Sequence, residues 1–397
     1  MTENRTLLSG TGISRRNLLI GAGTAAAVTG FPGILRAADD IKIGFCTAMT
    51  GLQTILGETQ LNCFKLAVDQ INAAGGVGGR RLSYVVEDNA TTTRGSIEKT
   101  RKLLFQDNVE AIIGMITSLE RQAALTVSTP AKKLLIYPTY YEGGECNPYL
   151  VCTGQIPNQA VAPFYPWLTK NVGKSVYILG SDYVWPQKTA DEIAAAATSA
   201  GGEVKGKEFF PFGTTDFGPV LERVRAANPD MVWCLFAGAD AVSFIKQYSG
   251  YGLSAKLVSN GIDEIFTAGL SGSEVEGIIV NQSYFSALQT PASQTFIESY
   301  RTAFGANTVV NAIGESTYAG VWLYAKAVEA AGSTETGKVI AAIREARFEA
   351  PEGEVHIDPS NNHMHTASIV GRCRADTTFE IIENFGMIAP AVTGCAL

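Results

Sequence analysis

The chain has 397 residues, of which 46% are hydrophobic and 17% are charged, proportions that fit a globular protein. This length is too great for one ordinary hydrophobic core and predicts two domains. The net charge of -7, with no basic run to offset it, argues against a nucleic-acid partner. No stretch after residue 38 reaches the roughly 18 apolar residues of a membrane span, so we expect no membrane insertion of the mature chain.

The first segment carries the pattern of an export signal. Arg15 and Arg16 are followed by a weakly apolar stretch at 18–28 and by small residues at Ala37 and beyond. This order predicts a twin-arginine signal peptide over 1–38 and a mature protein in the periplasm. The alternative is a buried N-terminal helix that happens to carry two arginines.

After the signal, short apolar runs alternate with segments that are apolar on one helical face. This alternation predicts a parallel sheet with helices on both faces. Strands are predicted at 41–45, 82–87, 111–114 and 134–137, and helices at 57–72, 93–106 and 118–129.

The same pattern then starts again, with Asp216 placed to cap one of the helices. Two similar halves in one chain predict two similar lobes. Strands are predicted at 175–180, 204–209, 231–236 and 257–259, and helices at 186–200, after 216 and at 240–251.

The last part of the chain changes character after Glu349, where alternating strands predict an antiparallel addition. The predicted fold class is α/β, with two doubly wound parallel-sheet lobes joined by a hinge and a C-terminal antiparallel β addition. The N-terminal lobe is predicted at 39–157 plus 287–349 and the C-terminal lobe at 158–286 plus 350–397. The predicted elements after 260 are a strand at 278–284, helices at 291–304, 314–331 and 337–346, and strands at 353–357, 366–373 and 379–384.

Seven cysteines in an exported protein permit disulfides. Cys146 and Cys152 are the best pair, because the Asn-Pro step between them can turn the chain back. Cys373 with Cys395 is a second possible bridge. No CxxC pair is present, which argues against a zinc or thioredoxin-type site.

Ligands of open parallel sheets bind beyond the carboxyl ends of the strands. The residues there are hydroxyls, amides and aromatic rings with few charges, a chemistry that suits a small neutral polar ligand. The alternative is that the aromatic rings only seal the core. The segments concerned are 47–51, 117–118, 138–141, 181–186, 237–240 and 260–261.

Two other motifs do not predict a cofactor or a metal. The glycines at 75–79 follow a helix and precede a strand, the reverse of a phosphate-binding loop. His356, His363 and His365 lie in a turn-rich region without helical spacing, so no metal site is predicted.

Several stretches resemble the type I periplasmic binding proteins, the solute receptors of ABC importers, over essentially the whole mature chain. Within that superfamily the chain is most similar to the short-chain amide and urea binding group. The stretches that carry the resemblance are 74–80, 137–143 with 157–159, 180–186, 214–217 with 227–230, and 361–363.

The resemblance implies a ligand site and a partner, the membrane permease. Urea or a short amide is the implied ligand. An acidic Asp240 or Asp263 would instead meet an ammonium group and favour a branched-chain or other small amino acid. The implied ligand-binding residues are Thr117, Ser118, Tyr137, Thr139 and Tyr140 from the first lobe and Tyr183, Trp185, Asp240 and Asn260 from the second.

Two other function classes fit the sequence less well. A hydrolase such as an amidase needs an activated nucleophile beside a base, and no G-x-S-x-G elbow occurs. An amide-sensing regulator would have no reason to be exported. We therefore expect a non-enzymatic binding protein without cofactors.

Overall fold

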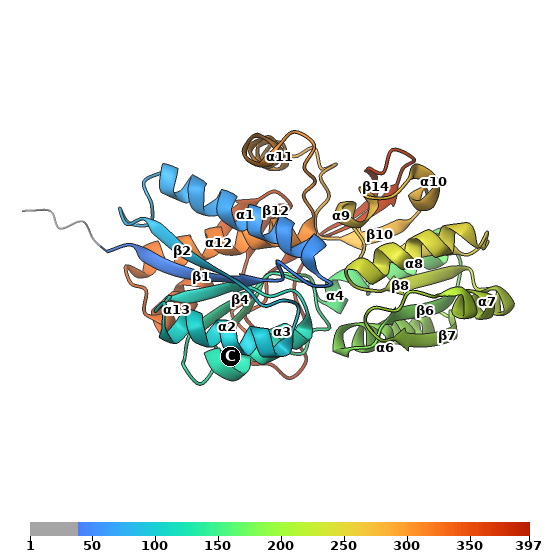
Figure 1. Ribbon diagram of the computed structural model, residues 1–397, viewed down its shortest axis with the longest axis horizontal. Helices are drawn as coiled ribbons and strands as arrows, with labels where there is room; N and C mark the ends of the chain where they lie inside the picture. The colour runs from blue at the N-terminus through green and yellow to red at the C-terminus, as the bar shows by residue number, and fades with distance from the viewer. Residues whose placement is uncertain (1–38) are drawn as a thin grey trace, which may run out of the picture. The chain divides into compact units, whose positions relative to one another are not determined.

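The computed structural model describes residues 39–397, which form two sheets of mainly parallel strands and one small antiparallel ribbon (Figure 1). The export signal predicted over 1–38 lies outside the described residues. Each large sheet carries helices on both faces, so we call each sheet with its helices a lobe.

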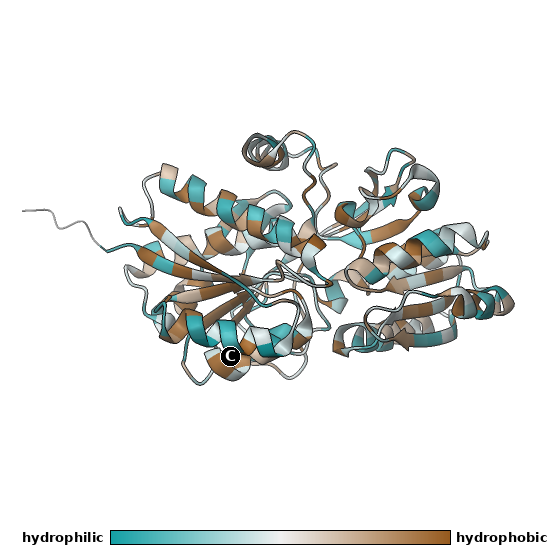
Figure 2. Ribbon diagram, viewed as in Figure 1, coloured by the Kyte–Doolittle hydropathy of each residue, from teal (hydrophilic) through white to brown (hydrophobic). Residues whose placement is uncertain are grey.

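The first lobe is built on a five-stranded parallel sheet of order β2-β1-β3-β4-β5. Strands β1, β3, β4 and β5 are largely buried on both faces, which explains their apolar sequence, whereas the edge strand β2 is partly exposed (Figure 2). Ile43 and Phe45 belong to the same core cluster as α1, and Ile112 to the cluster of α2 and α3. The strands are β1 Ile41–Thr47, β2 Leu82–Asp88, β3 Ala111–Gly114, β4 Leu134–Tyr137 and β5 Leu150–Cys152; the helices are α1 Thr54–Ala73, α2 Thr93–Phe105 and α3 Ser118–Ser128.

The second lobe is built on a seven-stranded sheet of order β14-β13-β10-β9-β8-β6-β7. Strands β6 to β10 are parallel, and β13 and β14 extend the sheet in the antiparallel sense. Core residues of α7 and α8 cluster on one side and those of α5 and α6 on the other. The strands are β6 Ser175–Ser181, β7 Glu203–Phe210, β8 Met231–Leu235, β9 Lys256–Ser259, β10 Ile279–Gln282, β13 Thr366–Cys373 and β14 Phe379–Ile388; the helices are α5 Phe164–Asn171, α6 Val184–Ser199, α7 Gly218–Ala227 and α8 Ala239–Gly250.

After β10 the chain returns to the first lobe, where α12 (Ala312–Ala331) packs against α1. The ribbon of β11 (Arg347–Ala350) and β12 (Gly353–His356) packs against α12 in turn. The predicted lobe boundary at 349/350 falls inside this ribbon. The remaining helices are α4 Pro157–Ala160, α9 Glu264–Thr267, α10 Gly272–Val275, α11 Pro291–Phe304 and α13 Thr336–Ile343.

Three segments connect the lobes, at 153–163, 283–290 and 357–365. The first and third lie side by side, because Met364 donates its N–H to the Cys152 carbonyl over 2.8 Å. The Gln155 amide also donates to the Ala367 carbonyl over 2.7 Å. These bonds join segments far apart in sequence at the place where a hinge is expected.

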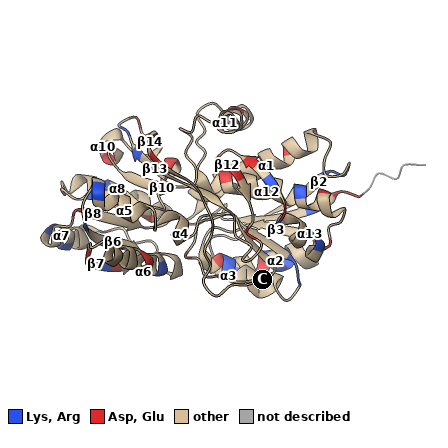
Figure 3. Ribbon diagram, turned by 180° about the vertical axis from the view of Figure 1, so that it is seen from behind, with Lys and Arg blue, Asp and Glu red and all other residues tan. Residues whose placement is uncertain are grey.

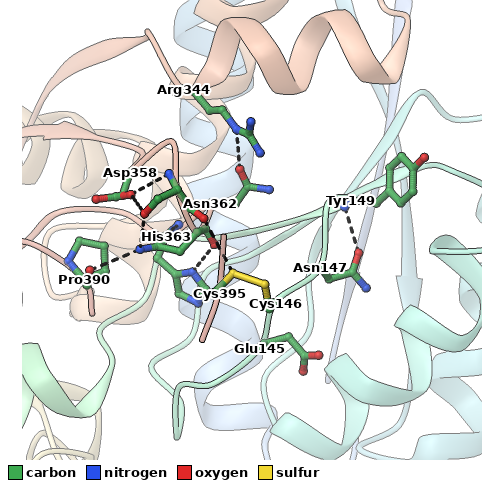
Figure 4. Close-up of a disulfide and its surroundings, with 12 residues drawn as sticks. Glu145, Cys146, Asn147, Tyr149, Arg344, Asp358, Asn362, His363, Pro390 and Cys395 are labelled. Carbon is green, nitrogen blue, oxygen red and sulfur yellow. Dashed lines mark hydrogen bonds between the residues drawn. A yellow bond between two sulfur atoms is a disulfide. The ribbon is translucent and has the colours of Figure 1, made fainter. Parts of the chain in front are cut away.

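The predicted disulfide between Cys146 and Cys152 is wrong, because Cys146 bonds to Cys395 instead (Figure 4). The expected turn does form, with the Leu150 N–H donating to the Asn147 carbonyl over 3.2 Å. Cys152, however, ends β5 and its side chain is buried in the core, while Cys146 lies in the exposed loop before it. The second predicted bridge, Cys373 to Cys395, is also wrong, since Cys373 is a buried free thiol.

The disulfide fastens the tail that follows β14 to the first lobe. Ala391 donates its N–H to the Asn158 side chain over 3.0 Å, and Leu397 donates to the Ser360 carbonyl over 2.9 Å. The tail therefore contacts two of the three connecting segments, 153–163 and 357–365.

Candidate functional site

A small pocket lies where the carboxyl ends of the strands of both lobes meet. Its free volume is about 10 Å³, close to the space of one water molecule. No charged side chain lines it, although charges of both signs are scattered over the outer helices (Figure 3). The lining residues are Gln53, Leu56, Ile116, Thr117, Ser118, Tyr137, Thr139 and Tyr140 from the first lobe and Tyr183, Trp185 and Ala237 from the second.

The start of α3 forms one wall of the pocket. Thr117 is the N-cap residue, and its hydroxyl accepts the Glu120 N–H over 3.3 Å. The Glu120 carboxylate in turn accepts the Ile116 N–H over 2.9 Å. This capping box holds the first turn of α3 rigidly against the pocket.

Ser118, the first residue of α3, is buried, and its hydroxyl is already bonded within the protein. It donates to the Glu142 carboxylate and accepts from the Arg121 guanidinium over 3.2 Å. Arg121 is only 1% exposed, and its guanidinium lies 2.9 Å from Glu142 and 3.3 Å from Glu145. It also lies 4.2 Å from the centre of the Tyr141 ring, in a cation–π contact.

Sequence reasoning missed this buried ionic network. Arg121 is one helical turn after Ser118, and Glu142 lies inside the stretch that carries the family resemblance. These two positions in the sequence could have indicated the network. The network fixes the side chain of Ser118, so we expect it to position this residue for a ligand.

The end of β4 supplies three predicted residues that are all present at the pocket. The Tyr137 hydroxyl donates to the Ile116 carbonyl over 2.7 Å, and the Thr139 hydroxyl donates to the Met115 carbonyl over 3.1 Å. Both side chains therefore brace the backbone that precedes α3. The Tyr140 ring reaches across to the second lobe.

The second lobe contributes mainly aromatic surface. Tyr183 is the N-cap residue of α6 without a capping side-chain bond, and Trp185 is 2% exposed. The ring centres of Tyr140 and Trp185 are 5.1 Å apart. Gly261 permits this approach, because a Cβ there would lie 2.7 Å from the Trp185 ring.

The two lobes touch on both sides of the pocket. Tyr140 donates its hydroxyl to the Gly261 carbonyl over 2.9 Å, and Ala239 donates its N–H to the Leu52 carbonyl over 3.2 Å. These contacts close the cleft. Gln53, next to Leu52, lines the pocket with a fully buried side chain.

Gln53 was not among the predicted residues, because the segment considered after the first strand stopped at Gly51. The structure places Gln53 at the N-cap of α1. Reading two residues further, to the start of the helix, would have found it.

Two of the predicted residues do not line the pocket. Asp240 accepts the Gly213 N–H over 3.0 Å, and burial raises the pKa of its carboxyl. Asn260 accepts the indole N–H of Trp233 over 2.9 Å. Both therefore support loops of the second lobe.

Asp263, the other acid considered for an ammonium group, is also engaged. One of its oxygens accepts the Ile265 N–H over 3.1 Å, and the other accepts from the Asn311 amide over 2.8 Å. Burial raises the pKa of Asp263 to about 7. Asp263 caps α9 and bonds to Asn311, the N-cap residue of α12.

Within residues 39–397, no group of three or more His, Cys, Asp or Glu side chains is arranged to hold a metal ion. His363 instead meets the Tyr141 hydroxyl and stacks on its ring. Among the helices of this described part, none combines the length and apolarity needed to cross a membrane.

The fold and the closed pocket define a two-lobed binding protein, and comparison with known proteins agrees. A substrate-binding protein from R. palustris, solved in complex with benzoate, matches with a TM-score of 0.83 and 21% identity, covering 90% of this chain and 100% of that one. An ABC transporter substrate-binding protein from Sphaerobacter thermophilus matches with a TM-score of 0.78 and 26% identity, covering 87% and 98%. These matches confirm the predicted fold class.

The family follows from the sequence. The profile described as "Periplasmic binding protein" matches residues 40–378, so the chain belongs to this family. Membership implies a periplasmic location. The leucine-, isoleucine-, valine-, threonine-, and alanine-binding protein of Pseudomonas aeruginosa is 24% identical over 345 residues, which cover 84% of this chain and 90% of that protein.

Proposed function

We propose that this protein is the solute-binding component of an ABC importer and that it captures urea or a short-chain amide between its lobes. The observation that carries the proposal is the pocket, which is small and has no charged lining residue. A neutral ligand needs no buried counter-charge, whereas an unpaired ion would be costly in such a site. The partner would be a membrane permease that receives the solute.

The capture step needs no covalent chemistry. The lobes would open and close about the three connecting segments, near the predicted bounds of 39–157 plus 287–349 and 158–286 plus 350–397 but with the β11–β12 ribbon kept whole in the first lobe. Hinge closure around a ligand is an established behaviour of two-lobed binding proteins. Export by the twin-arginine signal would bring the protein to the compartment where such solutes are collected.

The second candidate ligand is a branched-chain or other small amino acid. The name of the Pseudomonas aeruginosa relative favours it. The start of α3 would suit the carboxylate, since helix N-termini attract anions. The ammonium would need an acid, and both oxygens of Asp263 are already bonded.

An amidase activity has less support. The Ser118 hydroxyl meets a carboxylate, but that carboxylate is paired with the Arg121 guanidinium, which weakens it as a base. Incubation of the purified protein with acetamide or urea should release no ammonia.

Calorimetric titration and thermal unfolding of the mature protein would test the ligand. The panel is urea, formamide and acetamide against leucine, alanine and benzoate, since bound ligand raises apparent stability by mass action. We expect heat and an increased Tm only with the first three. Binding of leucine or alanine alone would replace the proposal with the amino-acid alternative.

A further inference from the structure

The side chain of Gln53 is fully buried at the pocket and has no hydrogen-bond partner at either end of its amide within residues 39–397. Its backbone is fixed, because its carbonyl accepts the Leu56 and Gly57 N–H groups over 3.0 and 3.1 Å. The amide faces the second lobe, where a Cβ on Gly238 would lie 2.8 Å from its oxygen. A donor and an acceptor therefore sit together, unpaired, at the closing edge of the cleft.

This isolation sets Gln53 apart from the other buried glutamines of the described chain, each of which donates through its amide nitrogen. Buried polar groups are nearly always paired, so an amide left wholly unpaired at a pocket points to a ligand. The paired glutamines are Gln60, bonded to the Met115 carbonyl, Gln155 to Ala367, Gln159 to Met364 and Gln282 to Ile262.

The chemistry of a primary amide determines what it can pair with. Its N–H donates and its C=O accepts in one plane, so the best complement is another group with an adjacent acceptor and donor. Urea and primary amides have this pair of atoms, and the two amides would form two parallel hydrogen bonds. A carboxylate offers acceptors only and would repel the Gln53 oxygen.

We propose that Gln53 is the residue that selects a carboxamide: its Nε2 donates to the ligand carbonyl and its Oε1 accepts the ligand N–H. This inference rests on the proposed function and names the substrate class more narrowly. The lobes bring the amide to the ligand on closure, since Gln53 lies beside the Leu52–Ala239 contact. The free space of about 10 Å³ means that the cleft must also widen to admit even urea.

Titration of the full mature protein and three variants tests the inference. Gln53→Leu removes both bonding atoms and should weaken urea and acetamide binding about tenfold or more. Gln53→Glu keeps the shape but accepts only, so it should weaken acetamide about tenfold and gain binding of acetamidinium. Gln122→Leu, an exposed change on α3, is the matched control and should bind as the wild type does.

Two ligand analogues complete the test on the wild type. N,N-dimethylacetamide lacks the N–H and acetate lacks the donor, so both should bind about tenfold more weakly than acetamide. If the wild type binds acetamide and Gln53→Leu binds it equally well while remaining folded, the role of Gln53 is overturned and the proposed function stands. If the wild type binds neither urea nor any amide, the proposed function fails and the inference fails with it.

Discussion

The two walls of the pocket are built differently. The first lobe contributes eight lining residues, several of them hydrogen-bonded to backbone or to the Arg121 network. The second lobe contributes three, of which Tyr183 and Trp185 are aromatic rings and Ala237 is small. The difference suggests that the first lobe recognises the polar groups of a ligand and that the second lobe excludes water.

The support behind each wall differs in the same way. Behind the first wall lie a buried cation and two carboxylates, which hold Ser118 in one orientation. Behind the second wall, Tyr183 stacks on Phe212 with ring centres 5.1 Å apart. Ion pairs fix the orientation of the side chains that they hold, while contacts between aromatic rings tolerate small shifts of the rings. The second wall is therefore better suited to move.

The largest expected effect comes from breaking the ionic support of the first wall. Arg121→Met leaves Glu142 buried without its cation, and breaking a buried pair in this way costs about 3–5 kcal/mol. Guanidinium titration would measure the loss, and urea is avoided as a candidate ligand. The control is Lys207→Met, which removes an exposed pair with Asp191 and should cost less than about 1 kcal/mol. Equal losses of stability in the two variants would show that the buried ion pair of Arg121 stabilises the protein no more than an exposed pair does.

The disulfide joins the first lobe to the end of the chain. It connects the loop that carries Glu142 and Glu145 to the tail that follows β14 (Figure 4). Cys395→Ser should lower the free energy of unfolding by about 2–4 kcal/mol, the typical contribution of a disulfide, since the unfolded chain is no longer cross-linked. Wild type treated with a reductant should unfold at the same denaturant concentration as the variant. A reduced wild type as stable as the oxidised protein would contradict this.

A pair of buried acids in the first lobe predicts a pH dependence. Glu315 on α12 accepts the Glu352 N–H over 3.3 Å, and burial raises the pKa of Glu315, so that this carboxyl keeps its proton above its ordinary pKa. The folded state holds this proton while the unfolded state releases it near its ordinary pKa of 4.5. Stability should therefore fall as pH rises above 4.5, by about 1.4 kcal/mol per pH unit for one such group while the folded state stays protonated.

Glu315→Gln should make this slope shallower, since the neutral amide keeps the shape and loses the titration of Glu315 while the other buried acids still titrate. Unfolding midpoints from pH 5 to 8 would measure it, with the exposed Glu298→Gln as control. An unchanged slope in Glu315→Gln would remove the pair as its source.

The smallest effects concern the ligand itself and compare the walls directly. Ser118→Ala removes a hydroxyl of the first wall and should weaken ligand binding about five- to tenfold. Tyr183→Phe keeps the ring of the second wall and should change affinity less than about threefold. A larger loss in Tyr183→Phe than in Ser118→Ala would reverse the assignment of recognition to the first lobe.

Most of the fold could be predicted from the sequence, because its strands and helices are marked by strong periodicity. The β5 strand and the β11 strand were missed, since β5 has only three residues and β11, of sequence RFEA, lacks an apolar run. The tail was correctly expected to be antiparallel, and β13 and β14 follow the alternating pattern. Short elements depend on their neighbours in space for their strand pairing.

The position of the site in the fold could be predicted, but the direction of each side chain could not. The rule for strand ends of parallel sheets pointed to six of the lining residues from Thr117 to Trp185, and the family resemblance added Tyr137. Asp240 and Asn260 also follow strands, yet their side chains bond within their own lobe. The direction of a side chain in a loop, like the partner of Cys146, depends on contacts between distant segments, which local sequence does not encode.

The fluorescence of Trp185 should report on the opening of the cleft. Its indole is 2% exposed between the lobes, and its ring centre lies 5.1 Å from that of Tyr140 in the first lobe. Separation of the lobes would expose this indole to solvent, whereas Trp233 would stay fully buried inside the second lobe. Intrinsic fluorescence at the red edge of emission should therefore follow opening and capture in real time, without any attached dye.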